Sequence, residues 1–422
     1  MRIIMAATRL AGDDGVSLEA AKMREVLRAA GHEVWYLAGE LDPDEEQGVL
    51  VPEMHFARPE VRALTRRAFA GEGLDPHLTH EIEEAGVRLA ARLEPVFEEL
   101  KPELLVVQNA WAIPMHLPLA VALWRIVQRR RLPAVSHNHD YPWERPRFAR
   151  CHVRPLLARY FPPDHAVVQL SINSIAQREL KERRGLDSLL LPNVMDYDRP
   201  PPGFDAFNAD FRETLGIRPD QLLLLQPTRV VPRKRIELAV DLAVELAARD
   251  PVLLVSHAAG DEGQDYRRGL ETYAAERRVD LRFVHEYVAP RRRFSGQHKV
   301  YSLADAYLHA DFVTYPSRYE GFGNAMLEAV WMNKPLMIGR YPVYLSDIRP
   351  KGFRFVEVED RIAPEVVEQV VRLLDDAELR RSVVEHNREL ARRHFGYGTL
   401  RKVTRAALDE AIVRARGAKW PS

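Results

Sequence analysis

Two glutamates, Glu320 and Glu328, are separated by seven residues that include a glycine-containing turn. The apolar run 312–315 before them predicts a buried strand, and 324–332 predicts a helix with one apolar side. Backbone N–H groups at a helix N-terminus suit a phosphate, whereas carboxylates suit sugar hydroxyls. The pattern therefore predicts a site for a sugar attached to a nucleoside diphosphate. A turn that only packs a strand against a helix is an equally good interpretation of these residues alone.

A second strand–loop–helix segment carries cations. The apolar run Leu222–Leu225 is followed by Arg229 and Lys234. Two cations at the mouth of such a turn can neutralise a diphosphate leaving group. The alternative is a solvated basic loop, because Arg233 and Arg235 lie in the same stretch. Loop cations rarely contribute much to stability, so we expect replacement of Lys234 to lower activity and to leave folding almost unchanged.

The spacings Arg229–x4–Lys234 and Glu320–x7–Glu328, with the phrase YPSRYEGFGNAMLEA, resemble the signature of retaining glycosyltransferase family 4, which has the two-domain GT-B fold. The resemblance extends over nearly the whole chain. It implies transfer of a hexose from a GDP-, UDP- or ADP-linked donor. The balanced charge and the lack of a transmembrane segment favour a soluble small acceptor, such as a sugar, a polyol or a sugar acid, over a lipid. The resemblance implies no metal and no cofactor besides the nucleoside diphosphate sugar as co-substrate, because cations stabilise the leaving group.

The resemblance also assigns roles to residues. Glu320 would orient the sugar ring, Glu328 would bind the ribose hydroxyls, and the departing phosphate would take the acceptor's proton on the same face. The donor-binding residues that it implies are Arg229, Lys234, Glu320, Gly321, Phe322, Gly323, Asn324 and Glu328. The catalytic residues that it implies are His139, Glu320, Arg229 and Lys234.

The stretch Pro133–Asp140 predicts a strand end with His137 and His139 on one face. Metal ligation by these histidines with Asp140 is one interpretation, although no distant Cys or His cluster completes such a site. Histidines satisfied by hydrogen bonds in the core are another. The resembling family places a histidine six residues after such a proline, facing the donor sugar. His139 fits this position and Asp140 follows it, so both are assigned to the acceptor side.

The first loop also belongs to the acceptor side by this resemblance. Family members often have two adjacent glycines there, and this chain has Asp14 in the first place and Gly15 in the second. A carboxylate at Asp14 would repel phosphate but could receive a polar acceptor.

Composition excludes several classes of function. Lys and Arg number 61, and so do Asp and Glu, so no net field draws the chain to nucleic acid or a membrane surface. The single cysteine, Cys151, suits the cytoplasm, and no apolar run approaches the roughly 18 residues that a spanning helix needs. We expect a cytoplasmic protein without a nucleic-acid partner or stable membrane insertion, and leave its oligomeric state open. The stretch 141–160, with aromatics between arginines, could contact an anionic acceptor or lipid, although a solvated helix is the simpler interpretation.

Strands alternate with helices in both halves, which predicts an α/β fold with two Rossmann-like, doubly wound parallel sheets. The family resemblance places the two domains face to face across a cleft. We expect an acceptor-side domain over residues 1–198, a nucleotide-sugar-binding domain over 199–396, and a C-terminal helix over 397–422 that crosses back to the first domain. Pro200–Gly203 is expected to be the hinge.

Other functions remain open from the sequence. They are a lipid- or polysaccharide-directed glycosyltransferase at a membrane surface, a nucleotide-sugar epimerase or hydrolase, a phosphorylase, and a sugar-binding protein without activity. An epimerase would lack the spaced pair of glutamates, and a phosphorylase would need a much longer chain. Retention of both cations and both glutamates argues against a protein without activity.

Overall fold

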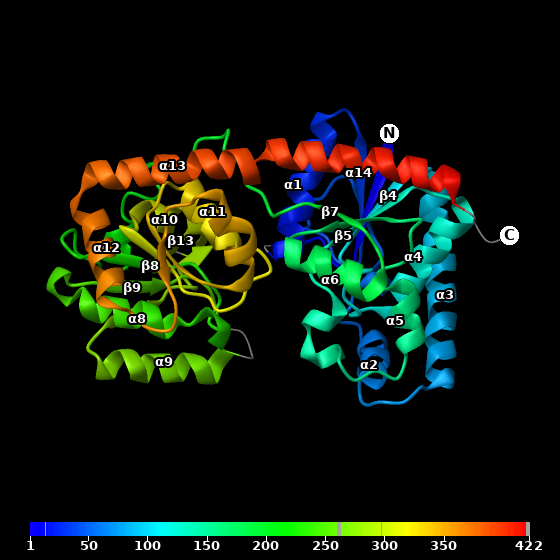
Figure 1. Cartoon of the computed structure of the whole chain (residues 1–422), viewed down its shortest axis with the longest axis horizontal. Coiled ribbons are helices and arrows are strands. Elements are labelled where there is room, and N and C mark those ends of the chain that lie inside the picture. Colours follow the sequence, from blue (N-terminus) through cyan, green and yellow to red (C-terminus); the bar gives the residue numbers. More distant parts are fainter. Residues whose placement is uncertain (13, 260–262, 297, 419–422) are drawn as a thin grey trace. The chain divides into compact units, whose positions relative to one another are not determined.

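We describe a computed structural model of the chain, covering residues 1–12, 14–259, 263–296 and 298–418. The chain forms two compact units (Figure 1). The first contains Met1–Asn193 together with the chain from Gly398 onward, and the second contains Val194–Tyr397.

The sequence pattern predicted the boundary at position 198, and the structure divides the chain a few residues earlier. Residues of the linker are hydrogen-bonded within the second unit. Trp331 Nε1 donates to the carbonyl of Arg199 at 3.0 Å, and Arg388 donates to the carbonyl of Tyr197 at 3.1 Å. The segment just before Pro200 is therefore part of the second unit.

The first unit is built on a seven-stranded sheet whose neighbouring strands are all parallel. In spatial order the strands are β3 (Gly48–Leu50), β2 (Glu33–Ala38), β1 (Arg2–Ala7), β4 (Leu104–Gln108), β5 (Ala134–Asn138), β6 (Val168–Ser171) and β7 (Ser188–Leu190). Every residue of β4 and β5 is buried, as expected for central strands that helices cover on both faces.

The helices of the first unit are α1 (Gly15–Ala29), α2 (Pro59–Ala68), α3 (Pro76–Leu100), α4 (Leu117–Arg130), α5 (Arg154–Tyr160), α6 (Ser174–Arg184) and α14 (Tyr397–Gly417). α3 packs against α4 at Gly86, where a Cβ atom would lie 2.5 Å from Cβ of Val121. The C-terminal helix is held to this unit by Arg414, which donates to the carbonyl of Val167 at 3.1 Å.

The stretch 141–160 differs from the single solvated helix expected from its sequence. Only its last part, Arg154–Tyr160, is an α-helix, and two 3-10 turns precede it at Pro142–Glu144 and Pro146–Phe148. Repeated prolines interrupt any longer helix because each lacks an N–H donor. Its aromatic side chains Tyr141, Phe148 and Tyr160 are buried and Trp143 is half-buried, so they do not form an exposed surface.

The second unit contains a six-stranded sheet, also parallel throughout. Its order is β10 (Asp280–Phe283), β9 (Val252–Val255), β8 (Leu223–Gln226), β14 (Phe312–Tyr315), β15 (Leu336–Gly339) and β16 (Val356–Val358). Its helices are α7 (Phe211–Thr214), α8 (Ile236–Glu245), α9 (Gln264–Glu276), α10 (Leu303–His309), α11 (Asn324–Trp331), α12 (Pro364–Asp375) and α13 (Ala377–Phe395). In Figure 1, α8 and α9 lie on one side of this sheet and α10 and α11 on the other. The two parallel sheets confirm the predicted fold class.

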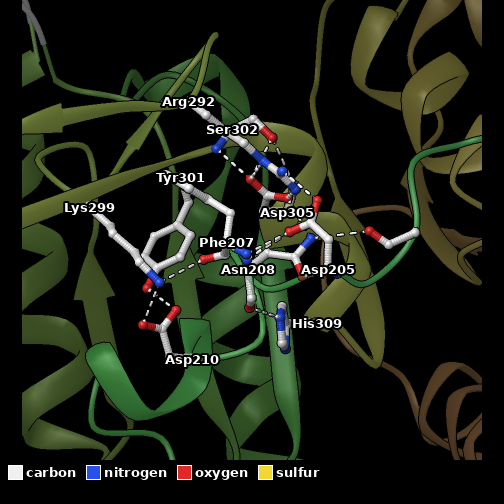
Figure 2. Close-up of polar contacts among 11 residues, drawn as sticks. Asp205, Phe207, Asn208, Asp210, Arg292, Lys299, Tyr301, Ser302, Asp305 and His309 are labelled. Carbon is white, nitrogen blue, oxygen red and sulfur yellow. Dashed lines mark hydrogen bonds and ion pairs between the residues drawn. The ribbon is translucent and has the colours of Figure 1, made fainter.

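A three-stranded sheet in the order β11 (Val288–Ala289), β13 (His298–Ser302) and β12 (Arg293–Ser295) adds to the second unit. A polar network ties it to the segment after the proline-rich linker (Figure 2). The buried carboxylate of Asp305 accepts hydrogen bonds from Arg292 and from Asn208, and Lys299 pairs with Asp210 at 2.8 Å. This network fixes how the chain enters the second unit.

Candidate active site

The strand order of the second unit brings the two predicted donor loops together. β8 and β14 are neighbours, with Leu225 paired to Val313, although many residues separate them in sequence. The strand order also reverses between them, because β9 and β10 lie beyond β8 whereas β15 and β16 lie beyond β14. Doubly wound sheets bind ligands off the carboxyl ends of the strands at such a reversal. The loops after β8 and β14 both begin at that point.

Glu320 and two cations from the loop after β8 form a buried cluster. Lys234 Nζ donates to Glu320 Oε1, and Arg233 Nη1 donates to Glu320 Oε2 at 3.0 Å. The side chains of Lys234 and Glu320 are each only 9% exposed. Lys234 Nζ also lies 5.2 Å from the ring centroid of Tyr315, which adds a cation–π contact.

Opposing effects set the ionisation of this cluster. Burial alone would raise the pKa of Glu320, but the positive charges of Lys234 and Arg233 outweigh it, and the pKa falls below its ordinary value. Burial lowers the pKa of Lys234, and the carboxylate of Glu320 opposes this effect. Lys234 and Glu320 are therefore both charged, and each is the counterion that stabilises the buried charge of the other.

Arg229 and Glu328, the other two charged residues that are predicted to bind the donor, have different surroundings. Arg229 is exposed, and its guanidinium makes no hydrogen bond or ion pair with the residues that the structure describes. Glu328 is half-buried on α11, and its Oε2 accepts a hydrogen bond from the hydroxyl of Tyr307 at 3.2 Å. Both stay predictions as donor-binding residues.

The turn from Gly321 to Asn324 is shaped by Gly323. Its φ of +130° belongs to a region that favours glycine, and a Cβ atom there would lie 2.5 Å from the hydroxyl oxygen of Tyr341. That hydroxyl donates to the carbonyl of Phe322 at 2.8 Å. Gly323 is the N-cap residue of α11 and has no side chain with which to cap the helix. A role of this turn in binding a ligand stays a prediction.

In the first unit, Asp14 is the N-cap residue of α1, which begins at Gly15. Its Oδ1 accepts from the N–H groups of Val16 and Ser17 at 3.0 and 3.1 Å. Arg9 lies 3.5 Å from its Oδ2. The start of α1 is therefore satisfied by the chain's own carboxylate, which leaves little attraction for phosphate. Acceptor-side roles for Asp14 and Gly15 stay predictions.

His139 follows β5 directly and is held by Asn109, whose Oδ1 accepts its backbone N–H at 3.0 Å. The rings of His139 and His137 lie 4.3 Å apart, so they do share one face. Burial lowers the pKa of His139 to about 4, although Asp140 and Asp14 oppose it. Its Nε2 is buried and has no hydrogen-bond partner among the described residues. His139 is thus a neutral imidazole with a nitrogen that remains to be satisfied.

Asp140 uses both carboxylate oxygens within the first unit. Its Oδ1 accepts from Asn109 Nδ2 at 3.1 Å, and its Oδ2 accepts from Arg145 Nε at 2.6 Å. The described ranges contain no group of three or more His, Cys, Asp or Glu side chains that could hold a metal ion. An acceptor-side role for Asp140 stays a prediction.

Three residues of these sites were not singled out from the sequence. Arg233 was grouped with the solvated cations, and only the contact with Glu320 distinguishes it. Asn109 has a positive φ of 59° after a buried strand, and turns of this kind favour Asn, which was an available signal. Tyr341 gave no local signal, because its contact with the turn is made across the fold.

Comparisons with known proteins show the family of the chain. The profile described as "Glycosyl transferases group 1" matches residues 207–390, which contain the loops after β8 and β14. Mannosylglucosylglycerate synthase of Thermotoga maritima is 35% identical, over 92% of this chain and 95% of that protein. The chain belongs to this glycosyltransferase family. Mannosylglucosylglycerate synthase of Petrotoga mobilis is 30% identical, over 85% of this chain and 86% of that protein.

A solved structure supports the fold of this glycosyltransferase. Sucrose-phosphate synthase from Thermosynechococcus elongatus superposes with a TM-score of 0.66 at 17% identity, over 98% of this chain and 100% of that chain. Two predictions from the sequence are confirmed: the chain has the GT-B fold, and it is an enzyme of the glycosyltransferase class. Among the described helices, none combines the length and the apolar character needed to cross a bilayer.

Proposed function

We propose that this glycosyltransferase moves a hexose from a nucleoside diphosphate sugar to a small, soluble sugar acid, with retention of configuration and without a metal ion. The observation that carries the proposal is the 35% identity to a mannosylglucosylglycerate synthase over 92% of the chain. We therefore infer a mannosyl donor and an acceptor that contains a glucosyl and a glycerate part. The other soluble acceptors expected from the sequence, simple sugars and polyols, are weaker candidates.

Departure of the diphosphate is the demanding step, because negative charge develops on the leaving group. Lys234, Arg229 and the N–H groups of the turn from Gly321 to Asn324 all belong to the two loops that meet beside β8 and β14. Fixed positive groups of this kind stabilise such a charge without reorganisation during the reaction. This supports a reaction that needs no metal ion to hold the phosphates.

Binding of the sugar and the ribose would use the carboxylates. Glu320 would accept hydrogen bonds from sugar hydroxyls. Glu328, kept in place by the hydroxyl of Tyr307 at 3.2 Å, would accept those of the ribose. His139 would contact the sugar as a neutral imidazole, since burial keeps its pKa near 4. A neutral ring can donate or accept a hydrogen bond without adding charge beside the developing oxocarbenium ion.

Retention would follow from attack on the face from which the diphosphate leaves. In that course the departing phosphate oxygen accepts the proton of the acceptor hydroxyl, while the bond from the sugar carbon to the phosphate oxygen breaks. The new glycosidic bond forms on the same side of the ring.

A matrix of donors and acceptors tests this function. GDP-mannose, UDP-glucose and ADP-glucose are each incubated with glucosylglycerate, glycerate, glucose and no acceptor, with EDTA present throughout. We expect transfer to glucosylglycerate with GDP-mannose, and a product whose anomeric configuration, measured by NMR, equals that of the donor. An inverted product, or hydrolysis of the donor without transfer to any acceptor, would contradict the proposal.

A further inference from the structure

Glu320 and the two cations next to it satisfy one another inside the protein. The carboxylate of Glu320 is buried, and each of its two oxygens accepts a hydrogen bond from a different cation. In this arrangement Lys234 and Arg233 are already neutralised, and the oxygens of Glu320 are already engaged. A donor that needs the cations for its phosphates and the carboxylate for its sugar must therefore exchange these contacts.

Arg233 and Arg235, two residues apart, point to different partners. Arg233 Nη1 donates to the carbonyl of Tyr319 at 2.8 Å as well as to Glu320. Arg235, which has a positive φ of 52°, donates instead to Asp360 at 3.2 Å. Asp360 is 92% exposed, so this second contact is a surface ion pair. The structure thus separates one arginine inside the charged cluster from one outside it.

We propose that Arg233 is a third cation for the donor's diphosphate, and that Glu320 is the internal counterion which this diphosphate displaces. This inference rests on the proposed use of a nucleoside diphosphate sugar. A diphosphate carries more negative charge than a carboxylate and accepts hydrogen bonds from both cations at once. Lys234 is buried and needs a counterion at every stage, which an exchange of Glu320 for phosphate provides.

The exchange couples recognition of the two ends of the donor. Once phosphate oxygens take over Lys234 and Arg233, the carboxylate of Glu320 loses its partners and becomes an acceptor for sugar hydroxyls. A sugar without a diphosphate would find Glu320 engaged. A diphosphate without a sugar would bind, but at the cost of leaving a buried carboxylate without its two cations.

The test measures binding of inorganic pyrophosphate, GDP, UDP and ADP by titration calorimetry at pH 6.5, where lysines remain charged. Glu320→Gln removes the charge that competes with phosphate. We therefore expect this variant to bind pyrophosphate, and whichever nucleotide the wild type binds, about tenfold more tightly than the wild type does. Arg233→Gln should bind them about tenfold more weakly. Arg235→Gln, the matched control from the same loop, should bind as the wild type does.

The sign of the first result separates this role from a structural one, because a disrupted site would not gain affinity. Affinity of Glu320→Gln equal to or below that of the wild type would overturn the counterion role. Equal affinities of Arg233→Gln and Arg235→Gln would overturn the assignment of Arg233, whose side chain is partly exposed and whose replacement spares the core. If the wild type bound none of the four probes, the proposed donor would be overturned as well. If the wild type bound them and turned over normally, and Glu320→Gln and Arg233→Gln had the same affinities as the wild type, this inference alone would be overturned.

Discussion

The hydroxyl of Tyr341 fills the space that a side chain on Gly323 would need, since a Cβ atom there would lie 2.5 Å from that oxygen. Gly323 also has a φ of +130°, which strains any other residue. We expect Gly323→Ala to displace the donor turn and to lower kcat/KM by about a hundredfold, because positioned donors of this kind contribute on that scale. Steady-state kinetics at low donor concentration measures the effect.

Gly269 provides a matched control for this substitution. It lies exposed in the interior of α9, and a Cβ atom there would meet nothing within 4 Å. Gly269→Ala should keep full activity and raise the free energy of unfolding by about 0.5–1 kcal/mol, since alanine favours a helix over glycine. Equal activity of the two alanine variants would show that the turn at Gly323 does not position the donor.

Replacement of Lys234 should affect both activity and stability. We expect Lys234→Met to lower kcat/KM by about 10²–10³, as for loss of one fixed charge-stabilising group. The expectation that folding is unchanged needs revision, because Lys234 is buried and pairs with the buried Glu320. Lys234→Met removes one partner of the buried pair and leaves Glu320 without it, so the free energy of unfolding should fall by on the order of 2–4 kcal/mol.

A double variant separates the two effects of Lys234. Lys234→Met with Glu320→Gln removes both buried charges, so most of the lost stability should return while activity stays low. Chemical denaturation of the four proteins, including the wild type, measures this coupling. A double variant that is no more stable than Lys234→Met would show that the ion pair is not what stabilises this part of the second unit.

Removal of metal ions should leave the enzyme active. In the proposed reaction Lys234, Arg233 and Arg229 neutralise the phosphates, so no divalent cation is required. Activity is compared after dialysis against EDTA and after addition of Mg²⁺ or Mn²⁺. If EDTA removes the activity and Mg²⁺ or Mn²⁺ restores it, a metal ion and not these side chains stabilises the leaving group.

Acid should weaken the network around Asp305. Burial would raise the pKa of Asp305, but hydrogen bonds from Arg292, Asn208 and Ser302 outweigh it and lower the pKa to about 2. The folded carboxylate therefore holds its proton less tightly than the unfolded one, whose pKa is near 3.9. The lowered pKa of Asp305 contributes about 2 kcal/mol to the free energy of unfolding. This stabilisation is complete above pH 4–5 and is lost as the pH falls toward 2.

Asp305→Asn tests this prediction through the pH dependence of unfolding. The free energy of unfolding should fall less steeply between pH 5 and 2 in the variant than in the wild type. Asp375→Asn is the control, because Asp375 forms an exposed pair with Arg249, and such surface pairs contribute about 0.5 kcal/mol or less to stability. Parallel curves for the wild type and Asp305→Asn would contradict the assigned pKa.

Local patterns predicted well the strand and the helix on either side of the turn from Gly321 to Asn324. The apolar run 312–315 is β14, and the helix expected from Asn324 is α11. Such predictions succeed because strand runs, glycine turns and helix starts depend on residues close together in the chain. The prediction of one solvated helix was wrong for 141–160, because repeated prolines interrupt the helix and packing buries Tyr141, Phe148 and Tyr160.

Residue types and spacings are local properties, and from them we predicted that cations follow β8 and that glutamates flank the turn after β14. Tertiary packing, in contrast, sets the contacts in which Lys234 and Arg233 both pair with Glu320 while Arg235 pairs with Asp360. It also brings Asn109 to the backbone N–H of His139. These contacts depend on pairing between distant segments, since β8 and β14 are neighbours although Lys234 and Glu320 are 86 positions apart. No local pattern specifies which side chains meet across such a pairing.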